Sequence, residues 1–194
     1  MTSLSPPASS FRPDLAQPAI RKANMGDIQA LLQLINGYAT DGIMLPRTEF
    51  EMSENIRDFS VAFAGSQLVG CGALHFYTPT SGEVRSLAVD PSIKTHGVGR
   101  RMIEALEKEA AENGLHAIFA FTYVPDFFRK MGFKEVERGE LPLKVWKDCL
   151  RCPKFSCCDE IAMVKALRPH PVLGAAREPG TTLVQLPQLK QIPR

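Results

Sequence analysis

The sequence predicts a mixed α/β layer fold with one main domain. Apolar runs typical of strands alternate with amphipathic, helix-patterned segments along most of the chain. The 194 residues are enough for one well-buried core and too few for two comfortable ones. Two glycines, Gly97 and Gly99, stand between an apolar run and the clearest helical pattern, which indicates a special turn or a close approach to the backbone.

The first elements are a strand and a helix. The segment 19–23 is predicted to be the short strand. Asn24 is a suitable N-cap residue, and apolar side chains recur at helical spacing from Ile28 to Ile35. Gly37 is expected to end this helix.

A second helix and a β-hairpin are expected next. The helix covers about 48–56, because Thr48 and Glu51 form a capping-box pattern. Strands at 60–64 and 68–75 are joined by a Gly-Ser turn. The remaining elements are a strand at 82–89, a helix at 98–113, a strand at 117–121, a short helix at 126–131 and a final strand.

The two ends of the chain differ from this central part. Residues 1–18 are rich in Ser and Pro without periodicity and are expected to be a disordered arm. Residues 168–194 form a Pro-rich tail, which leaves 19–167 as the domain. A net charge of +2 argues against a nucleic-acid partner, and no apolar run is long enough to span a membrane. The N-terminus lacks a secretion-signal pattern, so a cytoplasmic location is expected.

The glycine pair does not belong to either of two well-known phosphate loops. A P-loop requires Gly-x-x-x-x-Gly-Lys followed by Ser or Thr, which the sequence lacks. A dinucleotide fingerprint requires a third glycine where Met102 stands. What remains is a strand, an Asp-Pro turn, Gly-x-Gly and a long amphipathic helix.

This arrangement suits an anion. The amides of residues 95–100 are expected at a helix N-terminus, where the helix dipole favours negative charge. Lys94, Arg100 and Arg101 add positive charge, so a pyrophosphate is the expected ligand. A tight strand-to-helix turn without any ligand is the alternative.

These segments resemble the GNAT N-acetyltransferase family over about residues 19–167. The resemblance rests on the run from Leu87 to Gly99, the helix after it, the strand to Phe121 and the pair Gly132-Phe133. In that family a motif [QR]-x-x-G-x-[GA] binds the pyrophosphate of acetyl-CoA. Here Lys94 stands where Gln or Arg is usual.

The resemblance implies a mostly antiparallel central sheet flanked by helices. The strand ending at Val89 would splay from the strand at 117–121 around a bulge, and the pantetheine arm of acetyl-CoA would lie in the gap. The cofactor-binding residues would be Leu87, Ala88, Val89, Lys94, Thr95, His96, Gly97, Val98, Gly99 and Arg100.

Acetyl transfer to an amine needs a base, and the leaving thiolate can use an acid. Glu83, at the start of the central strand, is the best-placed carboxylate, with a solvated strand end as the alternative. The family often has a Tyr acid four residues before the final glycine, but here that residue is Phe128. Tyr123 is the substitute candidate, with core packing or substrate contact as its alternatives.

The acceptor is indicated by two further segments, 42–59 and 141–163. They resemble short, stand-alone amino-acid N-acetyltransferases of the N-acetylglutamate synthase group, which begin bacterial arginine biosynthesis. In that group a Leu-x-Arg holds the α-carboxylate of the substrate, and here Leu45 and Arg47 match it. An arginine fork suits a carboxylate.

Basic side chains could hold a second carboxylate. Lys144, Arg151, Lys154 and Arg85 are the candidates. L-Glutamate is therefore the favoured acceptor. L-Glutamine, another small amine and a non-catalytic acetyl-CoA sensor remain as alternatives.

The cysteine cluster and the partners stay open. Cys149, Cys152, Cys157 and Cys158 could pack as small apolar groups, bind zinc or have a redox or substrate role. Adjacent cysteines rarely ligate one ion together, so no metal is expected. The expected partner is a small-molecule amino acid, and a homodimer is left open.

Overall fold

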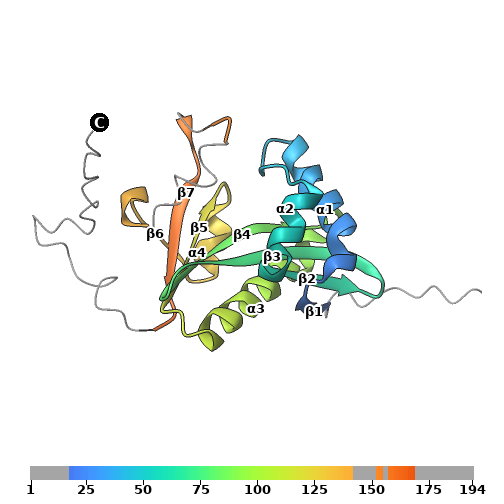
Figure 1. Cartoon of the computed structure of the whole chain (residues 1–194). Helices are drawn as coiled ribbons and strands as arrows, with labels where there is room; N and C mark the ends of the chain where they lie inside the picture. The colour runs from blue at the N-terminus through green and yellow to red at the C-terminus, as the bar shows by residue number, and fades with distance from the viewer. Residues whose placement is uncertain (1–17, 142–151, 155–156, 169–194) are drawn as a thin grey trace, which may run out of the picture.

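The computed structural model describes residues 18–141, 152–154 and 157–168, without the side chains of residues 94–96. These residues form one sheet with helices on both faces (Figure 1). The mixed α/β fold class is confirmed. The predicted arm and tail lie outside the described residues except at their innermost positions, so the domain division stays a prediction.

The sheet has seven strands in the order β1-β2-β3-β4-β5-β7-β6. All neighbouring pairs are antiparallel except β4 and β5, which are parallel. The strands are β1 (Ala19–Lys22), β2 (Phe59–Ala64), β3 (Gln67–Thr78), β4 (Ser81–Val89), β5 (Ala117–Thr122), β6 (Lys134–Glu135) and β7 (Ile161–Ala166). The α-helices are α1 (Ile28–Thr40), α2 (Glu49–Asn55), α3 (Val98–Glu112) and α4 (Pro125–Lys130). Short 3₁₀ helices are η1 (Met25–Asp27), η2 (Ile56–Asp58), η3 (Pro91–His96) and η4 (Arg138–Glu140).

Each face of the sheet carries its own hydrophobic cluster. Figure 1 shows α1 and α2 on one face and α3 on the other. Met102 and Leu106 of α3 are fully buried in one cluster, which also contains Phe128 of α4. Leu31 of α1 and Met52 of α2 are buried in the other. The sheet is therefore covered on both sides by the apolar stripes that the helical periodicity predicts.

The structure corrects the predicted end of the first helix. Gly37 lies inside α1, which continues to Thr40, and a Cβ at this glycine would have no neighbour within 4 Å. An interior glycine costs only about 1 kcal/mol, which packing along the helix can offset. Asn24 does cap a helical start, but of η1, and η1 leads directly into α1.

The other elements agree with the predictions to within a few residues. The α2 capping box is present, with Thr48 and Glu51 bonded reciprocally. The predicted hairpin of β2 and β3 is present as well. The 3₁₀ helix η3, just before Gly97, was not predicted, and the final strand is β7.

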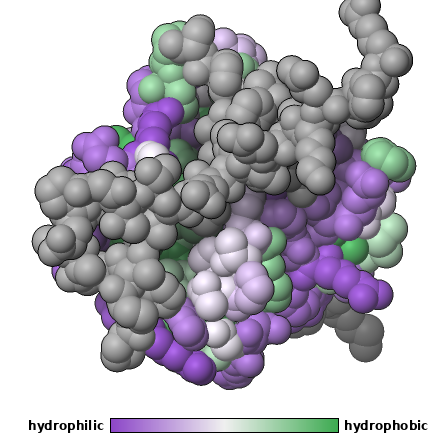
Figure 2. Space-filling view, turned by 60° about the vertical axis from the view of Figure 1, so that its left-hand side comes forward, coloured by the Kyte–Doolittle hydropathy of each residue, from purple (hydrophilic) through white to green (hydrophobic). Residues whose placement is uncertain are grey.

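Few large hydrophobic side chains are exposed among the residues that the structure describes. In the part of the chain that the structure describes, no helix is long and apolar enough to cross a membrane. On the face shown in Figure 2 the described surface is mostly hydrophilic, and its hydrophobic areas are small and separate. The exposed large hydrophobic side chains are Met25, Ile43, Phe50, Phe76 and Val124. A homodimer stays a prediction.

Candidate active site

The centre of the sheet opens between β4 and β5. The two strands pair only over residues 81–83 of β4 and 117–119 of β5. Beyond this point β5 continues to pair with β7, while β4 pairs only with β3 among the described strands. The register of β3 and β4 shifts near Ser86, whose φ of 52° is unusual for a residue other than glycine. The predicted splay around a bulge is therefore confirmed.

The opened strand leads to the N-terminus of α3. Gly97 is the N-cap and has a φ of 75°, a left-handed conformation that favours glycine. Its carbonyl accepts the first helical hydrogen bond, from the Arg101 N–H at 3.1 Å. The N–H groups of Val98, Gly99 and Arg100 therefore precede the helical ladder, and the glycine cap has no side chain to accept from them. The geometry fits an anion such as a diphosphate.

The residues around the N-terminus of α3 differ in their contacts. The Arg100 Nε donates to Glu104 Oε1 at 2.8 Å, so its charge is shared along the exposed face of α3. A Cβ at Gly99 would lie 3.4 Å from the Phe127 ring, an ordinary contact. Packing thus does not require a glycine at position 99, and the coenzyme role of Gly99 stays a prediction. Residues 94–96 lie in η3, and their side chains are not described.

Glu83 lies where β4 and β5 part. It forms the last pair with β5, opposite Phe119, and its β3 neighbour is His75. Glu83 is 0% exposed, which excludes the alternative of a solvated strand end. Val84 belongs to the α3 cluster, so Glu83 and Arg85 face the α1 and α2 side.

Arg85 is buried beside a second carboxylate. Its Nη2 lies 3.3 Å from Asp58 Oδ2 and 3.4 Å from Asn55 Oδ1. Asp58 Oδ2 also lies 2.5 Å from His75 Nδ1. The β3 residue opposite Arg85 is the small Ala73, which leaves room for the guanidinium to cross the strand. Asp58 therefore orients Arg85 and compensates part of its charge.

Tyr123 follows β5 and lies under a lysine. The Lys154 Nζ is 4.6 Å from the Tyr123 ring centroid and 3.5 Å from Asp159 Oδ1. Burial raises the pKa of the Tyr123 phenol, which keeps it protonated and able to donate. The hydrogen bond with Tyr123 raises the pKa of Lys154, which keeps the ammonium charged. Lys144 and Arg151 lie outside the described residues.

Phe128 is a core residue. It is buried, and its ring makes edge contacts with Phe127 and Phe133 at centroid distances of 5.4 and 5.1 Å. A phenyl ring at this position cannot supply a proton. Tyr123 remains the candidate acid.

The loop that carries Leu45 and Arg47 is held to α1. The Asn36 side chain accepts from the Arg47 N–H at 2.8 Å and donates to the Arg47 carbonyl at 2.9 Å. The next residue, Thr48, starts α2 with its capping box. The backbone of Arg47 is thus fixed on both sides, while Leu45 and Arg47 are half-buried.

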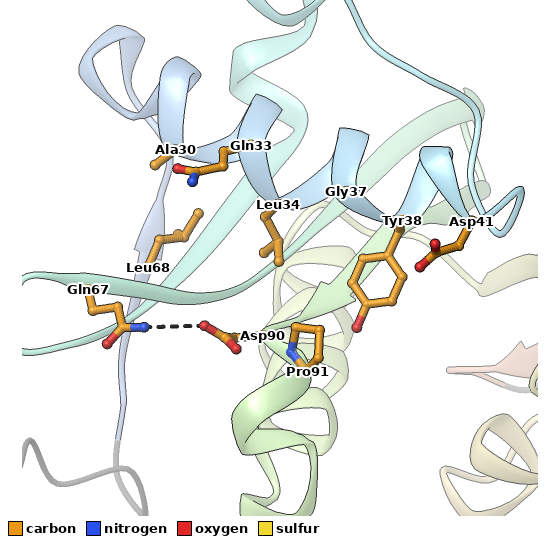
Figure 3. Close-up of a pocket in the computed structure, with 10 residues that line it drawn as sticks. All are labelled: Ala30, Gln33, Leu34, Gly37, Tyr38, Asp41, Gln67, Leu68, Asp90 and Pro91. Carbon is orange, nitrogen blue, oxygen red and sulfur yellow. Dashed lines mark hydrogen bonds between the residues drawn. The ribbon is translucent and has the colours of Figure 1, made fainter.

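A separate cavity of about 480 Å³ lies between α1, the start of β3 and the end of β4 (Figure 3). The Tyr38 hydroxyl donates to the Val89 carbonyl at 2.6 Å at its edge. The Gln67 side chain donates to Asp90 Oδ2 at 3.2 Å, as the dashed line shows. None of its lining residues is a predicted site residue. The cavity is therefore distinct from the gap beside β5.

The cysteines divide into a core residue and the cluster. Cys71 is fully buried, and burial raises the pKa of its thiol to about 12, so it is inert. Cys152, Cys157 and Cys158 are free thiols, and Cys149 lies outside the described residues. Within the described ranges, no group of three or more His, Cys, Asp or Glu side chains could hold a metal ion.

Sequence reasoning did not find Asn36, Asp58 and His75. Asn36 and Arg47 are 11 positions apart, and Asp58 and His75 are 17 apart, so no local pattern connects them. The available signal was a histidine at the end of an otherwise apolar strand pattern. Their pairing follows from the antiparallel register, which brings η2 beside the end of β3.

Comparison with known proteins identifies the family. The acetyltransferase (GNAT) family model matches residues 29–133. An uncharacterized N-acetyltransferase of Chlorobaculum tepidum is 43% identical over 152 residues, which cover 78% of this chain and 98% of that protein. The amino-acid acetyltransferase of Mycobacterium tuberculosis is 33% identical over 143 residues, which cover 72% of this chain and 82% of that protein.

A solved structure is similar over the same region. The N-acetylglutamate synthase of Neisseria gonorrhoeae, complexed with coenzyme A and N-acetyl-glutamate, has a TM-score of 0.72 and 28% identity. The similarity covers 79% of this chain but only 36% of that enzyme, so this chain spans about a third of its length. The resemblance found in the motifs is thus confirmed. This chain belongs to the acetyltransferase (GNAT) family.

Proposed function

We propose that this protein transfers the acetyl group of acetyl-CoA to the α-amine of a free amino acid, with L-glutamate as the acceptor. One observation carries the proposal: β4 leaves β5 directly after Glu83 and leads to the glycine-capped start of α3. A single strand therefore joins a buried carboxylate to an anion site. The pathway served would be arginine biosynthesis, and the location cytoplasmic.

The coenzyme contacts come from backbone groups. The N–H groups of Val98, Gly99 and Arg100 bind the diphosphate, helped by residues 94–96 of η3. Residues 87–89 of β4 hold the pantetheine arm and orient the acetyl carbonyl. Acetyl-CoA supplies an activated acyl group in its thioester.

The coenzyme site can be tested with two matched glycines. Gly97 and Gly114 flank α3, have φ values of 75° and 77°, and would place a Cβ in open space. Substituting either by Ala forces a left-handed alanine and should lower the free energy of unfolding by about 1–2 kcal/mol. Only Gly97→Ala should also weaken acetyl-CoA binding, about tenfold, because its Cβ would displace the diphosphate by enough to lose about one hydrogen bond to a charged group.

Titration calorimetry and thermal melts measure these two effects separately. Equal loss of stability with unequal loss of coenzyme affinity is the expected result. If both variants bind acetyl-CoA like the wild type, the diphosphate does not lie at this helix start.

The contacts to the amino acid begin on the face of the sheet that α1 and α2 cover, opposite α3. Arg47, fixed by Asn36, holds the α-carboxylate together with Leu45. Arg85 and Lys154, with Lys144, provide positive charge for the side-chain carboxylate. The relatives named for amino-acid acetylation, including one solved with N-acetyl-glutamate, support an amino acid as the acceptor.

Two residues handle protons. Glu83 removes a proton from the substrate ammonium, because only the neutral amine attacks the carbonyl. Tyr123, whose raised pKa keeps its phenol protonated, donates to the departing thiolate.

The proposal is tested by following thiol release from acetyl-CoA with each free amino acid in turn. Turnover with L-glutamate well above that with other amino acids is expected. A preference for L-glutamine would show that the alternative acceptor, L-glutamine, is the substrate. Binding of acetyl-CoA without thiol release for any amine would identify a coenzyme sensor and contradict the proposed activity.

A further inference from the structure

The buried position of Glu83 raises a question about proton transfer. A base that takes a proton in each turnover must pass it to solvent before the next one. Glu83 is 0% exposed, so water has no direct access to it in this structure. A partly exposed titratable group next to it would provide the exit.

His75 lies in that position. It pairs with Glu83 across β3 and β4, and residues directly opposite in antiparallel strands have Cβ atoms about 5 Å apart on the same face. Its side chain is 18% exposed, and that of its partner Asp58 is 26% exposed. Asp58, His75 and Glu83 therefore form a row across the sheet that runs from partly exposed η2 to the buried base.

The contact with Asp58 sets the tautomer of the imidazole. His75 Nδ1 lies 2.5 Å from Asp58 Oδ2, so the Nδ1–H donates to the carboxylate. Nε2 is then the nitrogen that can accept a proton. The negative charge of Asp58 stabilises the imidazolium that results.

Other charged groups surround this pair. Arg85, which belongs to β4, contacts the Asp58 carboxylate at 3.3 Å. Lys22, which belongs to β1, has its Nζ 3.2 Å from the Asp58 backbone carbonyl. The Tyr77 ring, also on β3, makes an edge contact with the imidazole at 5.1 Å. Arg85 shares the carboxylate with the imidazole, so Asp58 contacts both basic side chains.

We infer that His75, held by Asp58, relays the proton from Glu83 to solvent. The inference rests on the proposed function, in which Glu83 is the base. An ammonium N–H bond breaks and an O–H bond forms on Glu83. That O–H bond then breaks as an N–H bond forms on His75 Nε2, and the Nε2 proton finally passes to water. Glu83 returns to its carboxylate and His75 to its neutral form.

The test uses His75→Asn, whose amide can still donate to Asp58 but cannot carry a proton. The variant should lower kcat about tenfold with unchanged KM values, and added imidazole should restore part of the rate. His116→Asn, the same change at the start of β5, should behave as the wild type.

Repeating His75→Asn in a protein that already carries Glu83→Gln distinguishes a relay from a structural role. The relay acts through Glu83, so His75→Asn should have no further effect on kcat in a Glu83→Gln protein. If His75→Asn folds poorly, His75→Gln serves in its place. Wild-type kcat in these variants, or an equal loss in the Glu83→Gln background, would overturn the relay. Absence of turnover in the wild-type protein would instead contradict the proposed function.

Discussion

Glu83→Gln should lower kcat by about 10²–10⁴-fold, the usual contribution of a positioned base. Glutamine has the shape of glutamate, so the buried site beside Phe119 stays filled and the fold is retained. The diphosphate site at the start of α3 is untouched, so the affinity for acetyl-CoA should not change. Single-turnover thiol release together with calorimetric binding measures both quantities.

The pH dependence gives this prediction a second readout. Without the base, the substrate amine must lose its proton to solvent, so the residual rate should keep rising with pH where the wild type levels off. The matched control is Glu107→Gln. Glu107 pairs with Lys165 at 2.5 Å and belongs to α3, away from the gap, so its loss should leave kcat unchanged. A Glu83→Gln protein as active as the wild type would remove Glu83 from the mechanism.

Arg47→Ala should lower kcat/KM for L-glutamate about 100-fold, or by about 3 kcal/mol, the loss expected when a charged partner of a carboxylate is removed. The effect should appear mainly in KM, because the carboxylate contact is the same in the bound substrate and in the transition state. Asn36 holds the Arg47 backbone and not its guanidinium, so the loop should keep its position. Steady-state kinetics with L-glutamate as the varied substrate gives both constants.

Two further variants sharpen this result. Arg47→Lys should recover only a small part of the activity, because an ammonium cannot form the paired hydrogen bonds of a guanidinium. Arg168→Ala, at an exposed arginine that contacts the Ala111 carbonyl on α3, should keep the wild-type KM. An unchanged KM in Arg47→Ala would mean that another residue holds the α-carboxylate.

The local elements could be predicted from the sequence because their causes are local. Capping residues such as Thr48 and Glu51, the apolar stripe of α3 and the turn between β2 and β3 all act over a few positions. The glycine loop belongs to the same class, since Gly97 needs its left-handed conformation whatever packs around it. The predicted end of α1 at Gly37 was wrong, because packing and not the intrinsic preference of glycine decides where this helix ends.

The site was predicted only in part. Glu83 was identified by its place on the central strand, but its burial depends on which strands and helices cover it. The expectation that Arg85 faces a substrate carboxylate stays a prediction, and the structure adds its contacts with Asp58 and Asn55. The motif resemblance could locate a basic side chain but could not show which acidic residue lies next to it.

The sequence by itself determined the order of the elements, the glycine loop and the family, because these depend on neighbouring residues and short motifs. Only the tertiary structure decided where β4 separates from β5 and that Asp58, His75 and Glu83 form one row across the sheet. The physical reason is that strand register joins residues far apart in the chain. A shift of one residue in that register would turn each of these side chains to the opposite face.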